Sequence, residues 1–232
     1  MKNLLDEILL SDNVVENFHK NYENNSQFRE WILDILPEIQ HCQNQKQDNP
    51  WHIYNCLDHI LHSVEEINKQ TKKLDFSTRK NLAYTMFLHD IGKPERYIRR
   101  YSKLYKREVD SFFGHNIASV KICDRVLKQF GFDKANCDIV KKMVEMHDIF
   151  MFITLDKTTN PNHNQLTKQY IEKEIKKLDT VGNGRQLMKY LIMVGRADNK
   201  AQNPEMTAES LHLLDVMDTM LDELQNQEAM QK

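Results

Sequence analysis

Residues that interrupt helices are scarce in this sequence. Its 232 residues include only six glycines and five prolines, and apolar residues recur at spacings of three and four almost throughout. Alternating patterns typical of half-buried strands are nearly absent, and the one candidate strand, 149–155, could equally be a buried connector. The pattern therefore predicts an all-α protein.

Other absences exclude whole classes of protein. The four cysteines are widely spaced and form no Cys-x-x-Cys pair, which argues against a disulfide framework and against a cysteine-rich zinc site. No apolar run approaches the length of about 18 residues that crosses a bilayer, so we expect a cytoplasmic protein with no membrane partner. The formal net charge of −2 gives no general attraction to nucleic acid. Binding of an anion would therefore need a local basic patch.

Helical periodicity divides the chain into segments joined by polar loops. Neither of the clearest loops, 43–50 and 158–164, is long enough for a domain linker. We therefore expect one domain over residues 1–232, with an N-terminal helical extension over about 1–45 and a C-terminal helix over about 205–232. The expected helices cover 3–20, 26–41, 51–70, 78–91, 116–130, 135–147, 165–178, 184–202 and 207–227.

The most informative feature is the pair His89-Asp90. It continues an apolar helical stripe that includes Met86, so a histidine and a carboxylate stand where the pattern expects core residues. Burying an unpartnered carboxylate costs several kcal/mol, and a divalent cation would remove that cost. Gly92 and Pro94 follow at once and supply a stop for the helix. The pair indicates half of a metal site.

Further histidines and aspartates share this position on an apolar stripe or at a helix start. Any one of them is more often a hydrogen-bonded core residue than a ligand, but the set favours a metal site. Imidazole and carboxylate ligands without thiolate suit Mn, Fe, Co, Ni, Zn or Mg, as one ion or as two. The additional candidates are His59, His115, His147 and Asp198.

With these residues, the chain resembles the HD-domain metal-dependent phosphohydrolase superfamily, whose pattern is H…HD…D. The resemblance implies an all-α HD-domain helical bundle. Over about residues 30–202 the chain is similar to the HD domain found in some bacterial tRNA nucleotidyltransferases. The segments that carry this likeness are 36–39, 49–54, 58–59, 89–94, 113–115 and 145–148.

The resemblance also implies roles for single residues. His115 and His147 match additional histidines that bind a second metal or contact phosphate in some members. Lys93 would lie over the site as a phosphate ligand or as a stabiliser of transition-state charge, so Asp90 and Lys93 are the predicted catalytic residues. We expect His52 and His62, near the stripe of His59, to support the site or lie at the surface. The positions of the core metal ligands are His59, His89, Asp90 and Asp198.

Two family features are missing from the sequence. It has no counterpart of the nucleotidyltransferase catalytic domain, with its Gly-Ser turn and Asp-x-Asp pair, so nucleotide addition is not predicted. The Glu-Asp motif expected after His-Asp in alarmone hydrolases is replaced by the segment 92–95. Guanosine tetraphosphate is therefore a less favoured substrate.

A basic segment with interleaved tyrosines follows the metal motif. Residues 96–107 contain six cationic side chains, together with Tyr97, Tyr101 and Tyr105. The segment is either a solvated face or a lid that holds a phosphate and stacks a base. The predicted substrate-binding residues are Lys93, Arg99, Arg100 and His115.

We expect a metal-dependent phosphohydrolase that uses metal-bound hydroxide as its nucleophile. Its partner would be a phosphorylated small molecule or nucleotide, or an RNA end, and phosphomonoesters and phosphodiesters both remain open. The alternative is a non-catalytic module that binds a nucleotide or tRNA and holds a structural metal. Nothing in the sequence indicates an oligomeric state.

Overall fold

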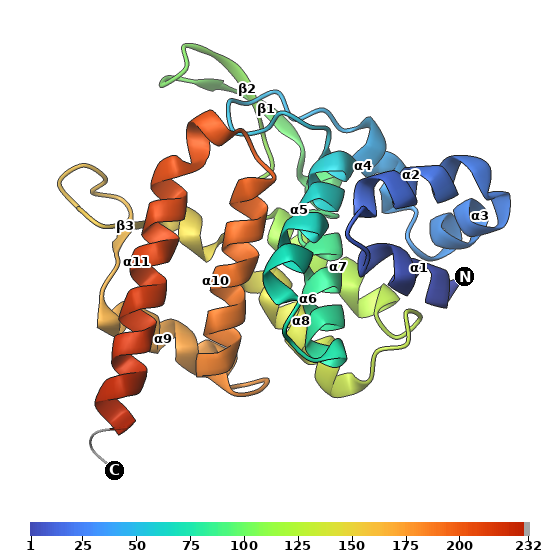
Figure 1. Cartoon of the computed structure of the whole chain (residues 1–232). Coiled ribbons are helices and arrows are strands. Elements are labelled where there is room, and N and C mark those ends of the chain that lie inside the picture. Colours follow the sequence, from blue (N-terminus) through green and yellow to red (C-terminus); the bar gives the residue numbers. More distant parts are fainter. Residues whose placement is uncertain (230–232) are drawn as a thin grey trace.

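Helices form most of the structure, a computed structural model that describes residues 1–229 (Figure 1). The described chain is 67% helical with only very small sheets, which confirms the all-α prediction. Positions 230–232 of the predicted C-terminal helix lie outside the described residues. The α-helices are α1 (Lys2–Leu9), α2 (Val14–Asn24), α3 (Ser26–Ile35), α4 (Glu38–Asn44), α5 (Cys56–Thr71), α6 (Phe76–Leu88), α7 (His115–Val126), α8 (Lys134–Met146), α9 (Lys168–Leu178), α10 (Gly184–Lys200) and α11 (Pro204–Ala229).

The centre of the bundle is a row of packed helices. Helix α5 packs between α6 and α10, α6 also packs on α8, and α8 packs on α7. Helices α9 and α11 cover α10 on its other side (Figure 1). This packing brings the ends of several helices together, and these ends carry the predicted ligands.

The N-terminal helices share the core of the central helices. The ring of Phe18 in α2 lies 6.0 Å from that of Phe87 in α6 and 5.9 Å from that of Phe28 in α3. The Tyr84 hydroxyl donates a hydrogen bond of 2.7 Å to Asp6 of α1. All four cysteines are free and buried. Within residues 1–229, no helix has both the length and the apolar character needed to cross a membrane.

Two predicted helices are each divided in two. The prediction of one helix over 3–20 is wrong, because α1 ends at Leu9 and α2 begins at Val14, with the polar residues 11–13 between them. The helix predicted over 26–41 is interrupted at Pro37. Proline lacks the N–H that a helix interior needs and disfavours helical geometry in the preceding residue. Helix α5 begins at Cys56 rather than 51, because the Asn55 side chain caps it by accepting from the Asp58 N–H at 2.8 Å.

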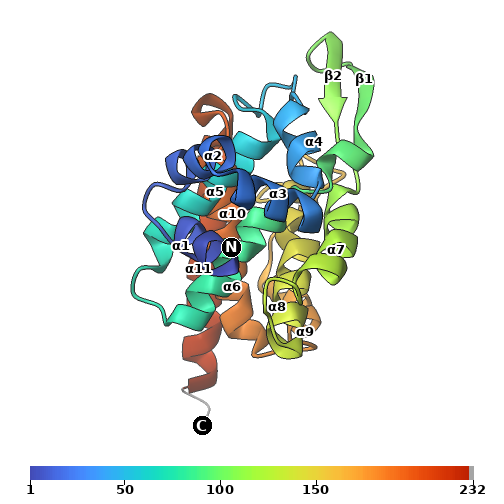
Figure 2. The same cartoon turned by 90° about the vertical axis from the view of Figure 1, so that its right-hand side faces the viewer.

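The basic segment contains strands that the periodicity did not indicate. Strands β1 (Ile98–Ser102) and β2 (Arg107–Ser111) pair antiparallel, with Arg99 opposite Asp110. The resulting β1–β2 hairpin projects beyond the helices (Figures 1 and 2). The candidate strand 149–155 is mostly the 3-10 helix η2 (His147–Phe152). Only β3 (Ile153–Thr154) is extended there, and it pairs in parallel with β4 (Asn164–Gln165).

Candidate metal centre

Five parts of the chain bring histidine and aspartate side chains to one buried place. His59 lies in the first turn of α5, and His89-Asp90 directly follow α6. His115 is the first residue of α7, and His147 directly follows α8. Asp198 projects from the last turn of α10. These are the six predicted metal ligands.

Asp90 stands between two groups of ligands. Its Oδ2 atom lies 3.1 Å from Nε2 of His59 and 3.3 Å from Nε2 of His89. Its Oδ1 atom lies 2.9 Å from Nε2 of His115 and 3.7 Å from Nε2 of His147. Each group, completed by Asp90, is compact enough to hold a metal ion. Each carboxylate oxygen of Asp90 therefore faces a different group of residues that could hold a metal ion.

A further aspartate lies beside the histidines of each group. Asp198 Oδ1 lies 3.0 Å from Nε2 of His59, so His59, His89 and Asp198 form what we term the first cluster. Asp148 Oδ2 lies 3.3 Å from Nε2 of His115, and its Oδ1 lies 3.4 Å from Nε2 of His147. We term His115, His147 and Asp148 the second cluster. Sequence reasoning missed Asp148 as a candidate ligand, although it belongs to the chain's other His-Asp pair.

The orientation of the four histidine rings fits a metal site. Each ring places Nδ1 at 2.6–3.2 Å from a backbone carbonyl, which can only accept, so Nδ1 carries a proton and donates it. Each Nε2 then faces Asp90 and is free to bind a proton or a metal ion. Such carbonyl partners typically orient metal-binding histidines. The carbonyls belong to Ala201, Met86, Phe112 and Val144, which hold His59, His89, His115 and His147 respectively.

Buried opposite charges dominate the electrostatics of the site. Burial alone would lower the pKa of His89, but the carboxylates of Asp90 and Asp198 raise it to about 10. Burial would raise the pKa of Asp90, but His89, Lys93 and His115 hold it well below its usual range. Asp90 is therefore ionised at neutral pH, and the site attracts positive charge.

Lys93 lies beside Asp90. It begins the 3-10 helix η1 (Lys93–Arg96), and its Nζ atom lies 2.5 Å from Asp90 Oδ2 and 2.8 Å from Oε1 of Gln47. His52 is close by, with Nε2 at 3.4 Å from the same Nζ. Burial and the Lys93 ammonium lower the pKa of His52 well below its usual range. The lysine is thus a buried cation within reach of anything bound at Asp90.

Gly92 sets the distance between the His89-Asp90 turn and α7. A Cβ atom at this position would lie 2.5 Å from the backbone nitrogen of Ser119 and 2.7 Å from the Ala118 Cβ. The Gly92 N–H donates to the Ser119 hydroxyl at 3.0 Å. Glycine therefore allows the turn that carries Asp90 to pack against the helix that begins with His115.

The remaining predicted substrate-binding residues lie on the hairpin. Arg99 pairs with Asp48 at 2.8 Å and with Asp110 at 2.9 Å, and Arg100 is exposed on the neighbouring position of β1. Within residues 1–229, neither side chain contacts a candidate metal ligand. His62 also lies apart, at 3.5 Å from Glu65. The structure thus places both arginines on the hairpin and not among the residues that bond to the candidate ligands.

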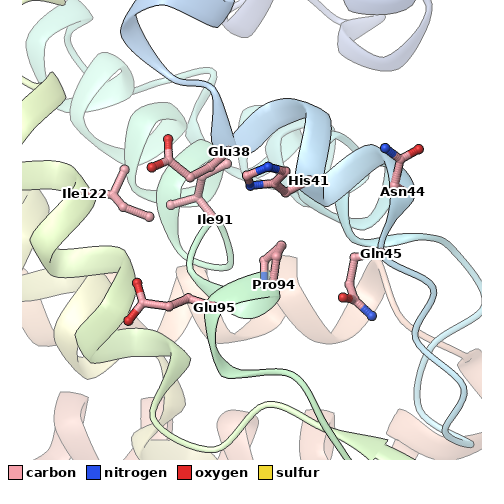
Figure 3. A pocket seen from close by; sticks show the side chains of 8 residues that line it. All are labelled: Glu38, His41, Asn44, Gln45, Ile91, Pro94, Glu95 and Ile122. Carbon is pink, nitrogen blue, oxygen red and sulfur yellow. The ribbon is translucent and has the colours of Figure 1, made fainter.

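A cavity of about 540 Å³ adjoins the His89-Asp90 turn without including any candidate ligand (Figure 3). Ile91 and Pro94 of the turn form part of its wall. The other lining residues are Glu38, His41, Asn44, Gln45, Glu95 and Ile122. A molecule bound there would contact the back of the turn and not the metal centre.

The family of the chain follows from its sequence match. A family model described as the HD domain matches residues 52–220, and the chain belongs to this family. HD domains bind divalent metals, and family members are generally metal-dependent hydrolases. The match spans both clusters. A search of curated proteins found no match.

Proposed function

We propose that this protein is a metal-dependent phosphohydrolase with a two-metal centre. The observation that carries the proposal is the position of Asp90, which offers one carboxylate oxygen to each cluster. Two cations held in this way, about 4 Å apart, are typical of enzymes that hydrolyse phosphate esters. When bound, the cations would activate a water molecule as the nucleophile and offset the negative charge of the phosphate.

The chain's own residues account for the rest of the proposed site. Lys93 is a buried cation beside Asp90, and we assign it the role of contacting the phosphate oxygens as negative charge develops on them. Gln47, which accepts from Lys93, holds the ammonium in place. The carbonyl-bound Nδ1 atoms fix the histidine rings, so that binding requires little reorganisation.

The proposed substrate is a nucleotide, a cyclic phosphodiester or an RNA end. This choice rests on the proposed resemblance of sequence segments to the HD domain of tRNA nucleotidyltransferases, which act on RNA ends. The basic hairpin beside the centre supports a nucleotide or RNA substrate. The proposal also includes a cytoplasmic location. Phosphomonoesters and phosphodiesters are both included in the proposal.

The test combines metal analysis with hydrolysis. Protein purified without chelator is analysed for bound elements, then assayed with bis(p-nitrophenyl) phosphate, p-nitrophenyl phosphate and cyclic nucleotides in Mn, Fe, Co, Ni, Zn and Mg. We expect bound metal, turnover that chelation abolishes, and loss of turnover in His89→Ala. Asp138→Ala, which changes a partly exposed carboxylate in α8 away from the candidate ligands, is the control. Bound metal without turnover of any ester would favour the non-catalytic nucleotide- or tRNA-binding module.

A further inference from the structure

The cationic side chains of the β1–β2 hairpin fall into two sets. Those of one set pair with carboxylates, and those of the other set do not. Arg99 bonds to Asp48, Glu108 and Asp110, and Arg107 bonds to Asp48. The Asp48 N–H donates to Asp110 Oδ2 at 2.8 Å, and the Asp110 N–H donates to the Asp48 carbonyl at 3.0 Å. The base of the hairpin is therefore fastened to the loop that precedes α5. It is held in a fixed position relative to the metal centre.

The tip of the hairpin has a different character. Within the described residues, Arg100, Lys103 and Lys106 have no carboxylate partner and are exposed. Tyr101 and Leu104 stand among them with 63% and 79% of their surfaces accessible. Residues 96–107 contain no acidic side chain. On a chain with a net charge of −2, these five residues, which we term the hairpin tip, concentrate positive charge and an exposed aromatic ring at one end of the hairpin.

The hairpin also has a defined relation to the metal centre. Lys93 precedes β1 by five positions and His115 follows β2 by four, so both ends of the hairpin begin at the site. The hairpin projects from the molecule at the opposite end from α9 (Figures 1 and 2). A ligand that contacts both the metal centre and the hairpin tip must be extended, and it must carry repeated negative charge.

We propose that the hairpin tip binds the backbone of a single-stranded nucleic acid whose end lies at the metal centre. Arg100, Lys103 and Lys106 contact successive phosphates, and the Tyr101 ring stacks on a base. The proposal rests on the proposed function for the position of the strand's end, and it narrows the substrate class to a polynucleotide. Single strands fit because their bases are free to stack, whereas the bases of a duplex are already paired.

The experiment measures binding of the metal-loaded protein to a fluorescent single-stranded RNA of about 12 nucleotides. Three phosphate contacts at the hairpin tip contribute about −2 to the slope of log K against log salt concentration, and one contact contributes about −0.7. We expect Lys103→Ala/Lys106→Ala to reduce the slope in this way and to weaken binding at least about fivefold. Tyr101→Ala should weaken binding about fivefold with the slope unchanged, because stacking is not ionic.

The matched control is Lys173→Ala/Lys176→Ala, which removes the same charge from exposed positions of α9. It should bind RNA like the parent protein. Equal weakening in both double variants would indicate a general charge effect and overturn the proposal. So would binding to phosphatidylcholine vesicles containing phosphatidylglycerol, with the same dependence on the hairpin tip and no binding to RNA. Circular dichroism verifies that each variant is folded.

Failure of this inference is distinguishable from failure of the proposed function. Metal-dependent hydrolysis of bis(p-nitrophenyl) phosphate by the parent protein tests the function alone, because that ester is too small to reach from the metal centre to the hairpin tip. Hydrolysis without RNA binding would overturn the inference and leave the function intact. RNA binding that depends on the hairpin tip, without hydrolysis of the ester, would support the inference and overturn the proposed function.

Discussion

Asp90 is the single residue on which both clusters depend. Its two carboxylate oxygens face different clusters, so Asp90→Ala removes a ligand from both, whereas Asp198→Ala removes a ligand from the first cluster alone. We expect Asp90→Ala to lose nearly all bound metal, and Asp198→Ala to keep about one of two equivalents. Elemental analysis of the folded variants measures this. Equal losses in the two variants would contradict the division into two clusters.

The protonation of His89 couples metal binding to pH. Its pKa of about 10 lies above the usual value of about 6.5. The ion pairs that raise it therefore stabilise the metal-free fold fully below pH about 6.5, and this contribution is lost as the pH rises through about 10. A metal ion must displace the same proton, so the apparent Kd should fall by up to about tenfold per pH unit between about 6.5 and 8.5. Calorimetric titration with Mn²⁺ tests this, and an affinity independent of pH would contradict it.

The sequence predicted individual candidate ligands, but it did not predict how they divide into two clusters. His89, Asp90 and Asp198 interrupt apolar stripes, so periodicity alone selects them. Asp148 does not, because it follows the last turn of α8 and is partly exposed. Asp148 lies near His115 only because α7 packs on α8, and a local sequence pattern does not indicate that packing.

At the scale of elements, the close approach of the His89-Asp90 turn to α7 depends on Gly92. Because a Cβ there would overlap Ser119 and Ala118, we expect Gly92→Ala to lower the free energy of unfolding by about 3 kcal/mol and to weaken metal binding. Gly114→Ala is the matched comparison. Its φ of +80° is strained for alanine, but nothing lies within 4 Å, so the cost should be about 1 kcal/mol. Urea denaturation measures both values, and equal costs would show that crowding is not the cause.

The hairpin is an element held by charge. Asp48→Ala removes the shared partner of Arg99 and Arg107. Because these ion pairs are exposed, global stability should change by less than about 1 kcal/mol, while trypsin should cut within 98–107 several times faster. Asp12→Ala, which breaks the exposed ion pair with Lys72, is the control and should not alter cleavage there. An unchanged cleavage rate in Asp48→Ala would show that the hairpin is held by other contacts.

The dependence of the hairpin on ion pairs with Asp48 explains why the sequence did not predict its strands. Its strands lack an alternating apolar pattern, and their pairing is reinforced by Asp48, which lies 51 residues before Arg99. The helices, by contrast, carry a periodic apolar face that a local window detects. The division of the N-terminal segments depended on Pro37 and on the polar residues 11–13, which outweigh that periodicity.

For the molecule as a whole, the shared core predicts cooperative unfolding. Phe18 is fully buried between Phe28 and Phe87, so Phe18→Ala should destabilise the protein by about 3–5 kcal/mol. The part of the protein that holds the metal centre and the N-terminal helices should still unfold together, in one calorimetric transition at a lower temperature. Exposed Phe76→Ala serves as the control and should change stability little. Two separate transitions would contradict the prediction of one domain.

The hydrogen bond between His59 and Ala201 has a consequence for the order of synthesis. The two residues are 142 positions apart, so at about 5–20 residues per second the ribosome delivers the carbonyl on the order of ten seconds after the ring it holds. Asp198 arrives equally late. A nascent chain thus carries an unassembled first cluster from the synthesis of His59 until that of Asp198 and Ala201, and metal loading at the complete cluster can follow only then.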